Sequence, residues 1–572
     1  MSALLASFDA TVAGWMPHLI LAPVLLPLLT GAVMVLLGER RHNLKALLGI
    51  GATALGLLVA VALLRWADQA GGSRAAVGVY LPGNWAAPFG IALVLDRLSA
   101  LMLVLASSVA LASAVFAAAR WHRAGVHYQP LFQFQLMGLY GAFLTGDLFN
   151  LFVFFEIMLA ASYGLLLHGS GRPRVAAGLH YIAINLAASA LFLVGVSLLY
   201  GVTGTLNMAD MAVKIAAVAP ADRGLLHAGA AILAVAFLAK AALWPLGFWL
   251  VPAYQAATAP VGALFAIMTK VGVYAVLRLS TLLFAPTAGA SAAFGGSWVF
   301  AGGLATLAFG AIGMLGSQKL GRLAGYGVIA SSGTLLAATS AGQATLTGGA
   351  LYYLLSSTLA ACLLFLLVDL IERWRNAGAT IAPHEEADHA PFLGADLRPM
   401  TGLNLDDQET ALVGHALPGA TALLGLAFLA CTLLIAGLPP LSGFVGKFAM
   451  LHALLNPAPG GQGGHVGPGS WLLMALLIGS GLFAMLALAR AGMRHFWAAQ
   501  GRGAPLVRPL EGLPVAALLL ACIALTLQAG PVLRYTQATA ESLHAPQAYI
   551  EAVLGARPRS APARPQVREA AP

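Results

Sequence analysis

Four ionisable residues, Glu156, Lys240, Lys270 and Lys447, stand within long apolar stretches of the sequence. An ionisable side chain at the centre of a membrane helix costs about 2.5–3.5 kcal/mol on the insertion scale, so each needs a partner or a function. Burial disfavours the charged form of a lysine, whereas a nearby carboxylate favours it. A glutamate that moves or loses its charge therefore makes such a lysine release its proton. We predict that Glu156 and Lys240 form this switching pair, with Lys270 as the next proton acceptor.

The alternative for each lysine is structural, either in a static buried ion pair or with its ammonium group reaching the membrane surface. Lys240 and Lys270 lie centrally in their stretches, which favours proton transfer, and Lys447 follows a helix break. His180 is also within an apolar stretch, where it either extends the relay or is a hydrogen-bonded core histidine. Asp147 begins an apolar stretch and is predicted to cap a helix, with proton gathering as the alternative.

Prolines interrupt two of these apolar stretches. Pro245 follows Lys240, and the pair Pro439 and Pro440 precedes Lys447. A proline removes a backbone donor, which lipid tolerates only where the freed groups face protein or a watery cavity. Broken helices at corresponding positions of two halves are typical of inverted-repeat transporters, whose ion sites lie near the breaks.

The composition explains where such residues must lie. Hydrophobic residues make up 60% of the 572 residues and charged residues only 9%. A soluble protein cannot bury that much apolar surface, so the solvent for most of this chain must be lipid. The net charge of +9 does not indicate nucleic acid as a partner, because the basic residues form short clusters between apolar stretches.

The apolar stretches predict an all-α polytopic membrane protein. A bilayer core of about 30 Å needs about 20 apolar residues per helix. On that basis the sequence predicts about fourteen spans, near 17–38, 44–66, 90–119, 130–146, 148–168, 175–200, 225–250, 258–284, 298–316, 322–341, 346–371, 419–455, 470–493 and 513–530.

These spans group into a predicted domain organisation. Three helices occupy 1–127, and two inverted five-helix repeats with broken helices occupy 128–284 and 298–497. The second repeat contains a polar, acidic insertion at 376–416. A fourteenth helix at 508–530 precedes a tail at 531–572 that is rich in Ala, Pro and Arg and is expected to be disordered.

Alternate loops carry the basic clusters, of which Arg40 with Arg41 is the first. Such loops are cytoplasmic by the positive-inside rule, so an even number of spans places both termini outside. The arginines of the tail disagree, but short loops carry more weight than tails. No Lys or Arg precedes Arg40, so we expect the first stretch to be a retained helix and not a cleaved signal.

The sequence has no metal-binding or nucleotide-binding motif that would indicate an enzyme. The three cysteines lie in apolar stretches without CxxC spacing, so they are interpreted as packed small side chains: Cys362, Cys431 and Cys522. His384, Glu385, Glu386 and His389 lack the HExxH spacing and are interpreted as a solvated loop, so no metal site is expected. No GxxxxGK[ST] motif occurs, which excludes an ATP-driven pump within this chain.

Three segments around these residues resemble the D-type subunits of the Mrp (also called Pha or Mnh) monovalent cation/proton antiporters. They read GDLFNLFVFFEIM at 146–158, FLAKAALWP at 237–245 and LPPLSGFVGKF at 438–448, and the resemblance covers about residues 15–530. It implies that Glu156 and Lys240 are the partners of the fifth and seventh helices. It also implies that Lys270 and Lys447 are the lysines of the eighth and twelfth helices on a central hydrophilic axis.

The same resemblance implies exchange of protons for Na⁺ or K⁺, assembly with other antiporter subunits in the bacterial inner membrane, and no bound redox cofactor. The sequence departs from many relatives, which carry a histidine in the eleventh helix near Ser356. The tenth helix, with Ser331 and Ser332, also lacks a histidine. We therefore expect the second half of the relay to rely on hydroxyl groups and water.

Two other functions remain to be distinguished from antiport. A proton-pumping subunit of a complex I-like or hydrogenase-type redox complex uses the same ionisable axis. A purely structural membrane scaffold leaves the four buried charges unexplained. The amino-acid sequences of the fifth-helix and twelfth-helix segments, together with the acidic insertion, favour the antiporter.

Overall fold

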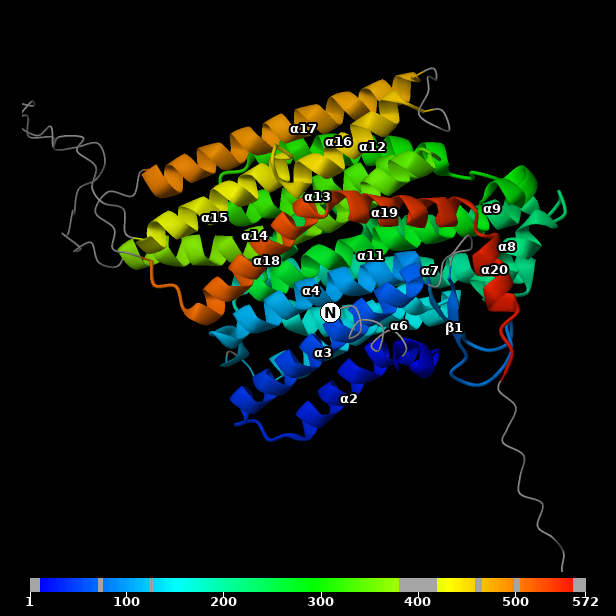
Figure 1. The fold of residues 1–572 in the computed structure, drawn as a ribbon, viewed down its shortest axis with the longest axis horizontal. Coiled ribbons are helices and arrows are strands. Elements are labelled where there is room, and N and C mark those ends of the chain that lie inside the picture. The colour runs from blue at the N-terminus through cyan, green and yellow to red at the C-terminus, as the bar shows by residue number, and fades with distance from the viewer. Residues whose placement is uncertain are drawn as a thin grey trace, which may run out of the picture.

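Helices that run along a common direction make up most of the computed structural model (Figure 1). It describes residues 11–69, 76–123, 125, 127–379, 419–457, 466–497 and 505–558. The predicted insertion from residue 380 onward, including His384, Glu385, Glu386 and His389, lies outside the described residues. Twelve helices in the described part are long and apolar enough to cross a membrane, so the all-α membrane fold is confirmed.

The N-terminal part contains three of these helices and one small hairpin. Its elements are η1 (His18–Leu21), α2 (Ala22–Leu36), α3 (His42–Gln69), β1 (Gly78–Tyr80), β2 (Leu93–Leu95), α4 (Arg97–Ala118) and η2 (Trp121–Arg123). The two strands are antiparallel, with Val79 opposite Val94. The hairpin was not predicted from the sequence, because each strand has only three residues.

The first predicted repeat runs from α5 to α11. Its elements are α5 (Tyr128–Leu144), α6 (Leu148–Leu167), α7 (Arg172–Thr203), α8 (Met208–Ala216), α9 (Arg223–Lys240), η3 (Leu246–Trp249), α10 (Leu250–Ala256) and α11 (Ala259–Leu283). The predicted cap is confirmed, because the Asp147 carboxylate accepts a hydrogen bond from the Asn150 backbone at 2.9 Å at the start of α6.

The second predicted repeat begins after a short helix and contains the second break. Its elements are η4 (Pro286–Ser291), α12 (Gly296–Gly316), α13 (Leu320–Ser340), α14 (Ala344–Ala379), α15 (Gly419–Ala436), α16 (Ser442–Leu455), α17 (Pro468–Gly492) and the π-helical η6 (Met493–Trp497). Helices thus occur at all predicted spans, but α5 and α13 are not among the twelve, and the count of fourteen and the repeat symmetry stay predictions.

Disorder of the tail from residue 531 was a wrong expectation for the part that the structure describes. After α18 (Pro509–Leu527), helices α19 (Ala529–His544) and α20 (Gln547–Leu554) continue to the end of the described region. Helix α19 packs against α14, and its buried face contains Thr536, Thr539 and Leu543. The Ala, Pro and Arg content averaged over the whole tail conceals this amphipathic helix; residues 559–572 lie outside the described part.

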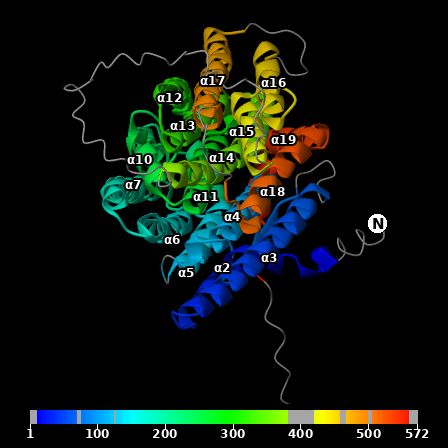
Figure 2. The same ribbon diagram turned by 90° about the vertical axis from the view of Figure 1, so that its left-hand side faces the viewer.

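The bundle centre is formed by α11 and α14, as the view in Figure 2 shows. In α11, 94% of the most apolar stretch is buried inside the protein, against 33% in α2 and in α3. Lys270 of α11 therefore lies in the core and not on the lipid-facing surface. Helices α2 and α3 lie at the margin of the bundle in the same view.

Candidate ion-translocation site

Glu156 and Lys240 come together through a third side chain, Ser189. The Ser189 hydroxyl donates a hydrogen bond to the Glu156 carboxylate. The Lys240 ammonium group donates to the same hydroxyl oxygen at 3.4 Å and also lies 5.3 Å from the centre of the Phe155 ring. Lys240 is 5% exposed, whereas Glu156 is half-buried. The predicted pair is therefore linked by a hydroxyl bridge, with no direct salt bridge between the two among the described residues.

Ser189 belongs to a polar face that sequence reasoning missed. Tyr181, Asn185 and Ser189 are spaced by four residues on α7, and all three are buried. Residues four apart lie on one face of a helix. This spacing was the available signal, because every other residue between Tyr181 and Ser189 in the sequence is apolar.

Lys240 is the last residue of α9, at the predicted break around Pro245. Beyond it the chain turns through Ala242, whose φ is +58°, before η3 begins. The groups freed by the break are bonded within the protein: the Trp244 backbone donates to Thr306 Oγ1 at 2.8 Å, and Trp249 Nε1 donates to the Ala239 carbonyl at 3.2 Å. Non-helical backbone at membrane depth is tolerated only where its polar groups bond to protein or to water in a cavity, and this break is bonded to protein.

A small cavity continues from Lys240 toward α11. Its volume is about 10 Å³, which is close to the minimum for one water molecule. Besides Lys240 of α9, its polar lining comes from α7, α10 and α11 and includes Asn185, Tyr181, Tyr254 and Thr269. The cavity therefore reaches from Lys240 to Met268 and Thr269 of α11, the helix that also carries Lys270.

Lys270 donates hydrogen bonds to two hydroxyls of α13. Its ammonium group is 2.9 Å from Ser331 Oγ and 3.2 Å from Ser332 Oγ, and the side chain is 1% exposed. Ser331 in turn donates to Ser357 Oγ of α14 at 3.0 Å. These bonds form a chain of donors that leads from Lys270 to Ser357, as expected where hydroxyls take the place of a histidine.

A second cavity lies between Ser357 and the broken helix α15–α16. It has a volume of about 30 Å³ and is lined by Ser331, Tyr353, Ser357, Leu434 and Ile435 among others. This volume suffices for about two water molecules. The cavity therefore adjoins the end of α15.

Lys447 lies at that end of α15. Its ammonium group donates to the Ala436 carbonyl at 2.9 Å, and the side chain is 8% exposed. A cation at a helix C-terminus is favoured by the helix dipole. Pro439 and Pro440 lie in the link between α15 and α16, as predicted, and Gly443 lets α16 approach this end, because a Cβ there would clash with the Leu434 carbonyl oxygen.

His180 does not join this axis. Its side chain is on the exposed surface of α7, and Nδ1 contacts the Ala176 carbonyl at 3.0 Å. The neighbouring Tyr181 points inward and bonds Ser162 at 2.7 Å. Hydropathy alone did not reveal the rotation of α7, which places adjacent residues on different faces. The expectation that His180 extends the relay is therefore not supported.

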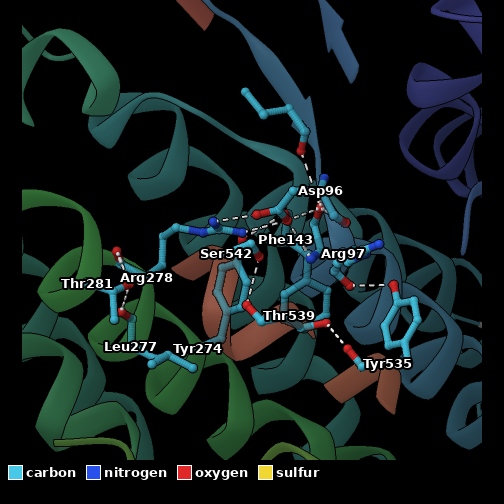
Figure 3. Close-up of polar contacts among 12 residues, drawn as sticks. Asp96, Arg97, Phe143, Tyr274, Leu277, Arg278, Thr281, Tyr535, Thr539 and Ser542 are labelled. Atoms are coloured by element: carbon cyan, nitrogen blue, oxygen red, sulfur yellow. Dashed lines mark hydrogen bonds and ion pairs between the residues drawn. The ribbon is translucent and has the colours of Figure 1, made fainter. Parts of the chain in front are cut away.

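The structure also contains a buried ion pair that the sequence analysis missed, between Asp96 before α4 and Arg278 in α11 (Figure 3). The two hydrogen bonds measure 2.6 and 2.7 Å. Burial raises the pKa of Asp96, but the charge and hydrogen bonds of Arg278 and those of Ser99 outweigh it and lower the pKa below its usual value. An arginine inside the apolar stretch 258–284 was the signal. Tyr549 of α20 lies 5.1 Å from the guanidinium carbon and ties the last helix to the pair.

Curated relatives cover nearly the whole chain. It is 53% identical over 542 residues to a probable K⁺/H⁺ antiporter component of the D type from Rhizobium meliloti (strain 1021), which covers 95% of this chain and 98% of the relative. The chain belongs to the D-type family of Mrp cation/proton antiporter subunits. Another member of this family, the D-type component of the Na⁺/H⁺ antiporter of Alkalihalophilus pseudofirmus, is 33% identical over 94% of this chain and 100% of the relative.

Other matches agree with this family. The family model described as "NADH:quinone oxidoreductase/Mrp antiporter, TM" matches residues 145–386. A chain in the structure of the Mrp complex from Dietzia sp. DQ12-45-1b has a TM-score of 0.76 and 26% identity, over 94% of this chain and 100% of that one. A chain of respiratory complex I from Thermus thermophilus, at 23% identity and a TM-score of 0.70 over 94% of this chain and 100% of that one, shares the fold.

Proposed function

We propose that this chain is the proton-translocating subunit of a multisubunit antiporter that exchanges protons for K⁺ or Na⁺ across the bacterial plasma membrane. The contacts from Glu156 through Ser189 to Lys240 carry this proposal. The names of the D-type relatives support antiport and assembly with other subunits, and the 53% identical relative makes K⁺ the first cation to test. The chain itself then acts as a secondary transporter component and not as an enzyme.

The contacts suggest an order of events for the proton. A charged Glu156 stabilises the protonated form of Lys240 through Ser189 and through space. When the carboxylate is neutralised or turned away, Lys240 loses this stabilisation and passes its proton through the water-sized cavity toward Lys270. Lys270 then donates along its serine bonds, and the larger cavity leads toward Lys447. The serine contacts of this route are direct hydrogen bonds, and the two cavities supply space for about one and about two waters.

The experiment compares cation-dependent loss of a pH gradient in everted vesicles that contain the whole operon. Glu156→Gln and Lys240→Ala are measured beside wild type, with K⁺ and Na⁺ added in turn. The matched control is Lys214→Ala, because the Lys214 side chain is 42% exposed and forms a 2.8 Å ion pair with Asp210 one helical turn away on α8. We expect the first two variants to assemble without transport and the control to transport normally.

A redox-linked proton pump is the competing function. Its support is the complex I-like fold, which is shared without close sequence identity. A wild-type complex that gives no response to either cation, while a quinone-linked or hydrogen-linked activity depends on this chain, would replace the antiporter proposal. Full transport by Glu156→Gln and Lys240→Ala would instead remove the proposed axis and leave antiport standing.

A further inference from the structure

A concentrated positive charge lies far from the proposed axis, at the turn between α2 and α3 at the lower left of Figure 1. An open concavity of about 480 Å³ is lined there by Arg40, Arg41, His42, Asn43 and Leu44, together with Arg123 of η2. The three arginines are exposed. No salt bridge involves any of them within the described residues.

The concavity is held together by Asn43, which joins two segments distant in the sequence. Its Oδ1 accepts a hydrogen bond from Arg123 at 3.5 Å and lies 3.2 Å from His122 Nε2. His122 is buried under the turn. Its pKa is lowered, first by burial and then by electrostatic interaction with Arg123 and the neighbouring His42, against a hydrogen bond to Ala117 that raises it. The site thus carries a positive field without a balancing acid, apart from the exposed Glu39 beside Arg40.

Helix geometry adds to this field. Helix α3 begins at His42, and its first residues His42, Asn43 and Leu44 line the concavity, so its positive end opens there. Backbone N–H groups at a helix start favour oxyanions, and phosphate groups above all. Arginine guanidinium groups bind phosphate with paired hydrogen bonds. Cationic side chains and a helix start therefore converge on one site.

The surroundings of the site are apolar. The adjoining surface of α2 and α3 exposes large hydrophobic side chains, including Leu36 at 86% and Leu47 at 69%. Leu44 lines the concavity itself. Acyl chains fit this surface, and a headgroup phosphate would then reach the arginines. A basic site at the end of membrane helices is the arrangement that binds anionic lipid headgroups.

We propose that this concavity binds the phosphodiester headgroup of an anionic phospholipid, with Arg40, Arg41 and Arg123 as its phosphate-binding residues. The acyl chains lie along the exposed surfaces of α2 and α3. This site is independent of the proposed proton axis. Free phosphate offers the same chemistry without the acyl chains, so the test must separate the two sources.

The test uses the purified complex that contains the full chain, and native mass spectrometry measures dissociation constants. The probes are dioleoyl phosphatidylglycerol, cardiolipin, dioleoyl phosphatidylcholine and inorganic phosphate. The variant R40Q/R41Q/R123Q removes three charges at the site. The control R172Q/R322Q/R375Q removes three exposed arginines elsewhere. Size-exclusion profiles and melting temperatures establish that both variants fold and assemble.

We expect wild type and control to bind both anionic lipids saturably and phosphatidylcholine weakly. Each lost arginine should weaken anionic lipid binding by about fivefold, so the site variant loses about 100-fold. Equal loss in both triple variants, or no saturable binding in wild type, would overturn the proposal. Equally tight binding of inorganic phosphate would identify free phosphate as the ligand and overturn the lipid assignment. A site variant that loses a partner protein but keeps its bound lipid would identify a protein contact and also overturn it.

Discussion

Ser189→Ala is the sharpest test of how the charged pair communicates. The substitution removes the hydroxyl that donates to Glu156 and accepts from Lys240, and it changes no charge. Hydrogen bonds to charged groups contribute about 1.5–3 kcal/mol each. If one such bond is lost in the rate-limiting transfer, the rate falls by about 10-fold to 150-fold, since about 1.4 kcal/mol corresponds to a factor of ten.

The assay is the initial rate of K⁺-dependent loss of the pH gradient in everted vesicles, normalised to the amount of assembled complex. Ser189→Thr keeps a hydroxyl and should recover most of the rate. Ser113→Ala is the matched control, because Ser113 is fully buried and donates to the Val109 carbonyl of its own helix at 2.8 Å. A wild-type rate in Ser189→Ala, in vesicles where Glu156→Gln is inactive, would refute the hydroxyl bridge.

Three further predictions concern the rest of the chain. Ser331→Ala removes the link between Lys270 and Ser357 and should lower the transport rate in the same assay by about tenfold. Ser340→Ala should leave the rate unchanged, because Ser340 is a half-buried serine of the same helix that bonds the backbone of that helix. His180→Ala should leave the transport rate within about twofold of wild type, because the side chain lies on the exposed surface of α7; a rate as low as that of Lys240→Ala would return it to the relay. Asp96→Asn leaves Arg278 buried without its counter-charge and should lower the free energy of unfolding by about 3–5 kcal/mol. Asp210→Asn should cost less than about 1 kcal/mol, because its partner Lys214 is 42% exposed and keeps contact with water. Because the pKa of Asp96 is lowered in the folded protein, its charge stabilises the fold fully above the unfolded pKa of about 3.9, and this stabilisation is lost as pH falls through the folded pKa. Melting temperatures of wild type and Asp96→Asn that change identically with acid would contradict this.

The sequence by itself determined the membrane class, the places of the predicted spans and four ionisable residues that lie within them. Apolar runs of about 20 residues follow from bilayer thickness, so hydropathy located the helices without knowledge of their neighbours. Charges inside these runs are too costly to be accidental, so Glu156, Lys240, Lys270 and Lys447 stood out at once. The prolines likewise located both breaks, because a missing backbone donor acts locally.

Only the tertiary structure decided which side chains meet. Glu156, Ser189 and Lys240 come from α6, α7 and α9, and their contact depends on how each helix is rotated about its axis. Hydropathy does not determine this rotation in lipid, where apolar residues can face either the membrane or the protein core. Because hydropathy leaves this rotation undetermined, it also did not reveal that His180 faces outward. The ion pair of Asp96 with Arg278 joins residues separated by 182 positions, so packing alone could bring them together.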